Sequence, residues 1–133
     1  MSVQIPRNHA QCVICQQPFF TDHVIEFQPT AQGVVRAEIV ATSQVQGYVG
    51  VMQGGLVTAL HDSAMLHCLF AEGVTAMTAK LETRFHHPVP IGETLIVEAK
   101  HVMSKRNVHY LQSEVRCGET LCSSAKSQFI SIS

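Results

Sequence analysis

The stretch "VMQGGLVTALHDSAM", residues 51–65, decides the fold of this chain. Two glycines open an apolar segment that predicts a helix from about Gly54 to Phe70, with Gly73 following where helices commonly end. The segment is apolar almost all round, which is typical of a helix that is buried on most sides. Asp62 lies in the middle of this segment. A carboxylate costs free energy there unless it is paired or has a function.

The residues on either side of this helix alternate between apolar and polar, which predicts β-strands. Residues 34–40 alternate in this way, and in residues 78–87 we expect Leu81 on the face opposite to Thr78. Further strands are predicted at 94–103, 108–117 and 121–132, with loops at 104–107 and 118–119. Short connections between long strands imply antiparallel pairing. The sequence therefore predicts an α+β fold, with a twisted antiparallel sheet wrapped around one long central helix.

Length and composition narrow the class of protein. The chain has 133 residues, which suits a single domain spanning 1–133, with an irregular segment at residues 1–20. Nine Lys and Arg stand against ten Asp and Glu, so no basic excess indicates binding to nucleic acid or to an anionic membrane. No segment matches a secretory signal or a membrane span. The five cysteines are irregularly spaced, which indicates reduced thiols and a cytoplasmic location.

Cys12 and Cys15 form a lone CxxC pair near the start of the chain. A zinc site normally needs a second pair or closely spaced histidines. Cys117 and Cys122 have the wrong spacing for the second pair, and the nearby His9 adds little. We therefore expect two ordinary thiols here, with no metal and no cofactor.

The order of these motifs resembles the hotdog-fold acyl-CoA thioesterases, in particular the group related to the phenylacetate pathway (PaaI-like). The matching features are the pair Gly54–Gly55, Asp62 eight residues after the first glycine, "RFHHPVPIGE" at 84–93 and "QGYVG" at 46–50. The resemblance covers about residues 12–131. Each motif is weak alone, but their order and spacing together are specific. The resemblance implies an acyl-CoA substrate, no metal, and a homodimer or homotetramer with sites at subunit interfaces.

Thioester hydrolysis needs a group that activates water or attacks the carbonyl, and donors where negative charge develops. Gly54 matches the family's oxyanion position at the helix N-terminus, and Gly55 lets a ligand approach the backbone closely. Apolar neighbours should raise the pKa of Asp62, which makes it the candidate general base or nucleophile. The sequence leaves these two roles open, beside an exposed or interface-paired carboxylate. Thr78 falls near a Ser/Thr position of the family and would orient water or the carboxylate.

Gln53 stands where the family usually has His. Its amide donates a hydrogen bond but cannot shuttle a proton, which leaves a changed substrate or low activity open. Met65 and Leu66 are candidates for an acyl pocket or, equally, for the core. Lys105 and Arg106 are candidates for CoA phosphate contacts, with a solvated turn as the alternative.

His61 is adjacent to Asp62 in the sequence but points about 100° away on the helix. A His–Asp pair within the helix is therefore disfavoured, and we expect His61 and His67 to be core or interface residues.

The sequence thus favours hydrolysis of an acyl-CoA thioester to free acid and CoA. The main alternative is a non-catalytic acyl-thioester binding protein of the same fold, for which Gln53 is the best reason. A hotdog dehydratase fits Gln53 and Asp62 poorly, because enzymes of that class use a His together with a carboxylate on the helix.

Overall fold

The computed structural model describes residues 3–132, so the predictions for residues 1, 2 and 133 lie outside the described residues. The long helix α1 (Gly54–Phe70) has the predicted bounds. The other elements are the short 3-10 helices η1 (Arg7–His9) and η2 (Ser43–Val45), and the strands β1 (Gln28–Ala31), β2 (Val34–Val40), β3 (Ala76–Phe85), β4 (Thr94–Lys105), β5 (Val108–Cys117) and β6 (Thr120–Ser131). Strand β1 was not predicted, because its four residues "QPTA" carry no apolar alternation.

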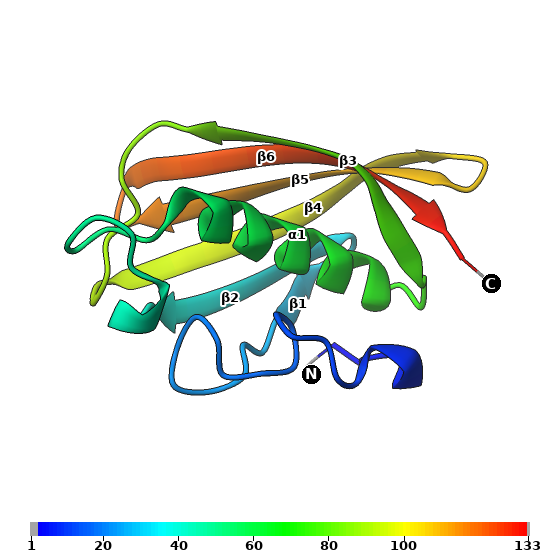
Figure 1. Ribbon diagram of the computed structural model, residues 1–133. Helices are drawn as coiled ribbons and strands as arrows, with labels where there is room; N and C mark the ends of the chain where they lie inside the picture. Colours follow the sequence, from blue (N-terminus) through cyan, green and yellow to red (C-terminus); the bar gives the residue numbers. More distant parts are fainter. Residues whose placement is uncertain (1–2, 133) are drawn as a thin grey trace.

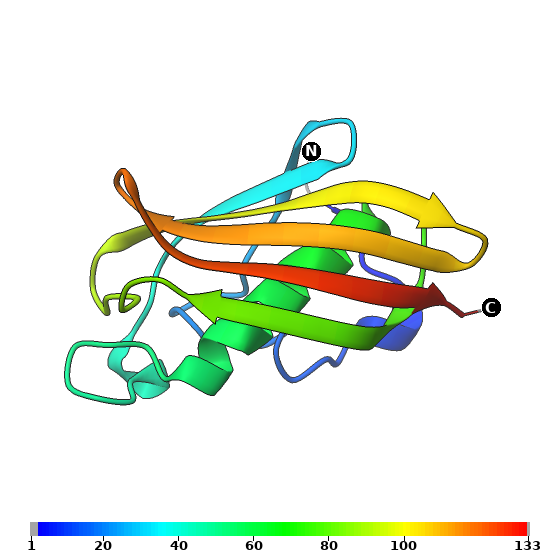
Figure 2. The same cartoon turned by 90° about the horizontal axis from the view of Figure 1, so that it is seen from above.

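One six-stranded antiparallel sheet runs in the order β1-β2-β4-β5-β6-β3, and α1 packs across one of its faces (Figures 1 and 2). The alternation in β2 is as predicted, with Val35, Ala37 and Ile39 buried toward the helix. The order leaves β1 and β3 as the two edge strands. The predicted α+β architecture is therefore confirmed.

The N-terminal segment covers the side of α1 that the sheet leaves open (Figure 1). The His9 ring packs edge-on against Phe70 at 4.9 Å, and Phe27 packs against His67 at 4.7 Å. This second cover explains why α1 is apolar all round, since it buries residues against the sheet and against the N-terminal segment.

A β-bulge in β3 overturns the predicted faces of that strand. The ladder with β6 shifts between Thr78 and Lys80, so that Thr78 pairs with Phe129 while Leu81 pairs with Ser127. Both partners are buried positions of β6. The extra residue places Thr78 on the same face as Leu81, toward α1, instead of on the opposite face.

The hairpin between β4 and β5 is tighter than predicted. β4 extends to Lys105 and β5 begins at Val108, so the loop is Arg106–Asn107 rather than residues 104–107. Arg106 has a φ of 60°, a left-handed conformation typical of such two-residue turns. Among residues 3–132, no helix is long and apolar enough to cross a membrane.

Candidate functional site

Asp62 and Thr78 form a hydrogen-bonded pair between α1 and β3. The Thr78 hydroxyl donates to Oδ1 of Asp62 at 2.6 Å. Burial raises the pKa of Asp62 above its usual value, while the Thr78 hydrogen bond and the nearby His9 oppose that shift. The pair holds one carboxylate oxygen in place, and a carboxylate of raised pKa is a stronger base than a solvated one.

The N-terminus of α1 presents free backbone donors. Gln53 is the N-cap, and its Oε1 accepts a hydrogen bond from the Leu56 N–H at 2.9 Å. The N–H groups of Gly54 and Gly55 donate no hydrogen bond within residues 3–132, and both glycines are exposed. Two donors at the positive end of the helix dipole therefore remain available to an anionic or polarised oxygen.

Glycine at position 55 leaves room for the capping side chain. A Cβ on Gly55 would lie 3.0 Å from Oε1 of Gln53, which would crowd the capping oxygen. A Cβ on Gly54 would meet only the Phe85 ring, at 3.8 Å, which is ordinary contact. The absence of a side chain at Gly54 instead leaves open the approach to its N–H.

A cavity of about 350 Å³ lies beside Gly54. Its lining includes two unusually exposed aromatic side chains, Tyr48 at 89% and Phe85 at 57% exposure, with His86 and His87 nearby. None of these four residues was predicted from the sequence to belong to the site. They nevertheless lie in the stretches 46–50 and 84–93, two of the motifs that resemble the thioesterase family. These motifs could have pointed to this part of the molecule.

The structure does not bring all predicted site residues together within one chain. Gly54 and Asp62 are eight positions apart on α1, which corresponds to about 12 Å along the helix axis. A single thioester carbonyl cannot reach both groups over that distance. Lys105 and Arg106 lie at the hairpin tip, at the opposite end of the molecule from the loop that precedes α1 (Figures 1 and 2).

Met65 and Leu66 belong to the hydrophobic core, with exposed fractions of 0% and 8%. The thioether sulfur of Met65 accepts a hydrogen bond from the Ser127 hydroxyl at 3.1 Å. The sequence left open whether these residues line an acyl pocket or belong to the core, and the structure favours the core.

His61 is fully buried and points at the sheet rather than at Asp62. Its ring nitrogens make hydrogen bonds with the hydroxyls of Ser113 and Ser123, the latter at 2.8 Å. Burial lowers the pKa of His61, and also that of the buried His67, to about 4. Both rings are neutral at neutral pH, and the expected absence of a His61–Asp62 dyad is confirmed.

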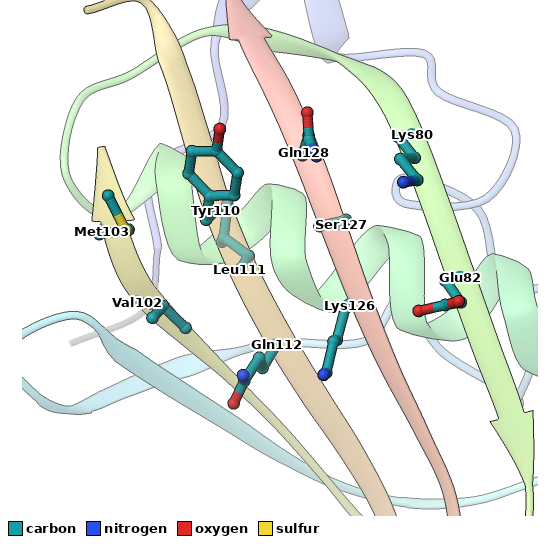
Figure 3. A pocket seen from close by; sticks show the side chains of 10 residues that line it. All are labelled: Lys80, Glu82, Val102, Met103, Tyr110, Leu111, Gln112, Lys126, Ser127 and Gln128. Carbon is teal, nitrogen blue, oxygen red and sulfur yellow. The ribbon is translucent and has the colours of Figure 1, made fainter. Parts of the chain in front are cut away.

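A second cavity, of about 280 Å³, lies on the face of the sheet away from α1 (Figure 3). Its lining carries charges of both signs, from Lys80, Lys126 and Glu82, beside Tyr110 and Met103. The sheet separates this cavity from Asp62, and its mixed charge gives no preference for the phosphates of CoA.

Three side chains of the metal-ligand type meet beside α1. The ligand atoms of His9, Cys12 and Cys15 all lie within 4.8 Å of one another. Burial raises the pKa of the Cys15 thiol to about 12, so without a metal this thiol is neutral and a poor nucleophile.

Comparison with protein families matches residues 49–124 to the family described as "Thioesterase superfamily". No match was found among the curated proteins. Among solved structures, the thioesterase superfamily protein RHA08564 is similar at 26% identity and a TM-score of 0.76, over 80% of this chain and 53% of that chain. This chain thus spans about half the length of RHA08564.

The PaaI protein from the phenylacetic acid degradation operon of E. coli is similar at 17% identity and a TM-score of 0.73, over 80% of this chain and 82% of that one. A hypothetical thioesterase of Streptococcus pneumoniae TIGR4, solved with coenzyme A, is similar at 15% identity and a TM-score of 0.75, over 80% and 87% of the two chains. These likenesses confirm the hotdog arrangement of one helix on an antiparallel sheet.

There are two further structures of the S. pneumoniae protein, each of a single mutant. One has alanine in place of an aspartate, and the other has alanine in place of a threonine. In that protein the threonine lies 16 positions after the aspartate, the separation that Asp62 and Thr78 have here.

Proposed function

Because the chain belongs to the thioesterase superfamily, we propose that it hydrolyses an acyl-CoA thioester to the free acid and CoA. The observation that carries this proposal is the Asp62–Thr78 pair, a base of raised pKa held by a hydroxyl at 2.6 Å. Coenzyme A in the structure of the S. pneumoniae protein supports CoA as the thiol portion of the substrate.

The free oxygen of Asp62 brings about attack on the thioester carbonyl carbon in one of two ways. As a general base it takes a proton from the attacking water, and as a nucleophile it forms an acyl-enzyme anhydride that water then hydrolyses. In both cases negative charge develops on the carbonyl oxygen. The N–H groups of Gly54 and Gly55 stabilise that charge, the C–S bond breaks, and the CoA sulfur leaves as a thiolate that takes up a proton.

The catalytic groups come from two copies of the chain. One chain holds Gly54 and Asp62 about 12 Å apart along α1, too far for one carbonyl to contact both. In a two-fold dimer, Gly54 of one subunit meets Asp62 of the other, so that two equivalent sites form. The edge strand β3 supports this assembly, because it is ten residues long and exposes Met77 and Phe85, and among residues 3–132 no strand pairs with its outer side.

The remaining substrate contacts follow from the same assembly. Tyr48 and Phe85, beside Gly54, supply an apolar surface for the acyl group. Lys105 and Arg106 bind the CoA phosphates from the second subunit, since they lie far from Gly54 of their own chain. The protein works in the cytoplasm, which its five free cysteines favour.

A non-catalytic acyl-thioester binding protein is the second candidate. Gln53 favours it, because its amide oxygen caps the helix and the amide cannot transfer a proton.

Release of free thiol from a panel of short, medium, long and aryl acyl-CoAs tests both candidates. We expect turnover of at least one class, and a drop of about 10²–10⁴-fold in Asp62→Asn. Asp22→Asn is the matched control, since Asp22 is exposed and its carboxylate pairs with His23. No turnover by the folded wild-type protein across the panel would leave the binding function standing.

A further inference from the structure

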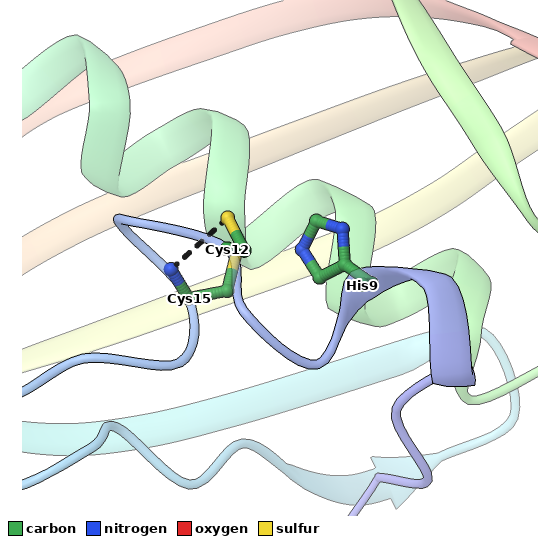
Figure 4. A group of neighbouring side chains, drawn as sticks. All are labelled: His9, Cys12 and Cys15. Carbon is green, nitrogen blue, oxygen red and sulfur yellow. Dashed lines mark hydrogen bonds between the residues drawn. The ribbon is translucent and has the colours of Figure 1, made fainter.

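We propose that His9, Cys12 and Cys15 form a binding site for zinc or another thiophilic divalent cation. The three residues follow an H-x₂-C-x₂-C spacing, and their ligand atoms lie within 4.8 Å of one another (Figure 4). From the sequence we expected no metal here, because a lone CxxC lacks a second pair and the nearby His9 adds little. The fold supplies the third ligand.

Successive tight turns set this spacing. The helix η1 ends at His9, whose carbonyl accepts a hydrogen bond from the Cys12 N–H at 3.2 Å, and the Cys12 carbonyl accepts from the Gln16 N–H at 3.0 Å. The Cys15 N–H donates to Sγ of Cys12 at 3.4 Å. A backbone donor on a sulfur stabilises the thiolate that a metal requires, so the loop is already shaped for ligation.

The donor set suits a soft cation. Two sulfurs and one imidazole nitrogen are ligands that zinc prefers in tetrahedral sites. Bonds of about 2.0–2.3 Å place tetrahedral ligands roughly 3.8 Å apart, so side-chain rotations that draw the atoms in by about 1 Å complete the site. Three protein ligands leave the fourth position to water. Binding displaces the two thiol protons to solvent, which balances the charge of the cation.

One polar atom of the cluster already lacks a partner. Nε2 of His9 is buried and makes no hydrogen bond within residues 3–132. Buried polar atoms without a partner are uncommon in folded proteins, and a bound cation satisfies this one.

The site has a defined place in the fold. Sγ of Cys15 lies 3.1 Å from the hydroxyl of Ser63, the residue after Asp62 on α1. The His9 ring packs on Phe70 near the end of the same helix. A bound cation therefore holds the turns of residues 9–15 together at the place where they pack against α1.

Cobalt titration of the full-length, reduced protein tests the proposal. We expect uptake of about one Co²⁺ per chain, with a thiolate-to-cobalt charge-transfer band and the visible bands of a tetrahedral ion, and displacement by zinc. Elemental analysis of protein purified without chelator should find zinc in the same ratio. Both readouts are independent of thioesterase activity.

Cys12→Ser and His9→Phe should abolish the cobalt bands, while Cys117→Ser should retain them. Cys117 is the matched control, because it is half-buried like Cys12 but lies outside the cluster. His9→Phe keeps an aromatic ring against Phe70 and removes only the ligand nitrogen, so the fold, checked by circular dichroism, should persist. The absence of a thiolate–cobalt band in the reduced wild type, or equal loss of the band in Cys117→Ser, would overturn the proposal.

Discussion

The hydroxyl of Thr78 lies 2.6 Å from the carboxylate of Asp62, and the bulge between Thr78 and Lys80 makes this contact possible. A regular strand would turn Thr78 to the outer face of the sheet, because side chains alternate with a period of two. The bulge shifts the register by one residue and aims the hydroxyl at α1. Bulges of this kind are common beside active sites.

Thr78→Val should move the acid limb of the rate profile to higher pH. The hydrogen bond from Thr78 lowers the pKa of Asp62 against the opposing effect of burial. Its removal raises that pKa further, so a higher pH is needed to ionise the base, and kcat/KM near neutral pH falls. The measurement is kcat/KM for the best acyl-CoA as a function of pH.

Thr83→Val is the matched control for that experiment. Thr83 is on the same strand and accepts a hydrogen bond from Thr58 at 3.2 Å rather than contacting Asp62. Its acid limb should coincide with that of wild type. An unchanged acid limb in Thr78→Val, with activity intact, would show that Thr78 does not tune the base.

Asp62→Asn should stabilise the fold at neutral pH while it removes activity. Burial raises the pKa of Asp62 in the folded state, so the folded state favours the protonated form. The stability from this group is therefore present below its unfolded pKa and is lost as the pH rises through the folded pKa. In urea unfolding, Asp62→Asn should have a higher free energy of unfolding than wild type at pH 7. This difference should disappear below about pH 4. Equal stabilities at pH 7 would argue against a desolvated carboxylate.

Mixing two inactive variants should restore activity if each site combines two subunits. Asp62→Asn lacks the base, and Gly54→Val blocks the approach to the oxyanion donor. A mixed dimer has one site with both groups intact and one with neither, so random mixing should recover about a quarter of wild-type activity. The assay is thiol release after the two variants are unfolded and refolded together. Each variant refolded alone is the control, and recovery no greater than these controls would place the whole site within one chain.

His61 and His67 should limit stability in acid. Burial lowers the pKa of each from 6.5 to about 4, so their stabilising effect is present above pH 6.5 and is lost as the pH falls toward 4. A shift of this size corresponds to on the order of 3 kcal/mol for each ring. His61→Gln keeps polar contacts with the sheet but cannot titrate, so its unfolding free energy should fall less steeply between pH 6.5 and 4.

His86→Gln is the control for this test, because His86 is exposed at the end of β3. Its pH dependence should follow that of wild type. Parallel slopes for wild type and His61→Gln would mean that other groups set the acid limit.

Local pattern in the sequence was sufficient for the central helix and for most of the long strands, but not for β1 or the two short 3-10 helices. The bounds of α1 followed from the glycine pair at 54–55 and the apolar run after it, and the faces of β2 followed from strict alternation. These features depend on residues within a few positions of one another, whose periodicity reflects what each element buries. Asp62 stood out for the same reason, as a carboxylate in an otherwise apolar helix.

The partners of these residues were decided only by the tertiary structure. The bulge that turns Thr78 toward Asp62 and the sheet hydroxyls that bind His61 depend on strand register. The approach of His9 to the two cysteines depends on the tight turns of residues 9–16, which no periodicity marks. Register is a cooperative outcome of the whole sheet, and one extra residue in a strand moves side chains to the other face. Local periodicity carries no record of such a shift, so the sequence by itself determined the central helix and most of the strands and marked Asp62 as a candidate, and the fold decided which side chains meet.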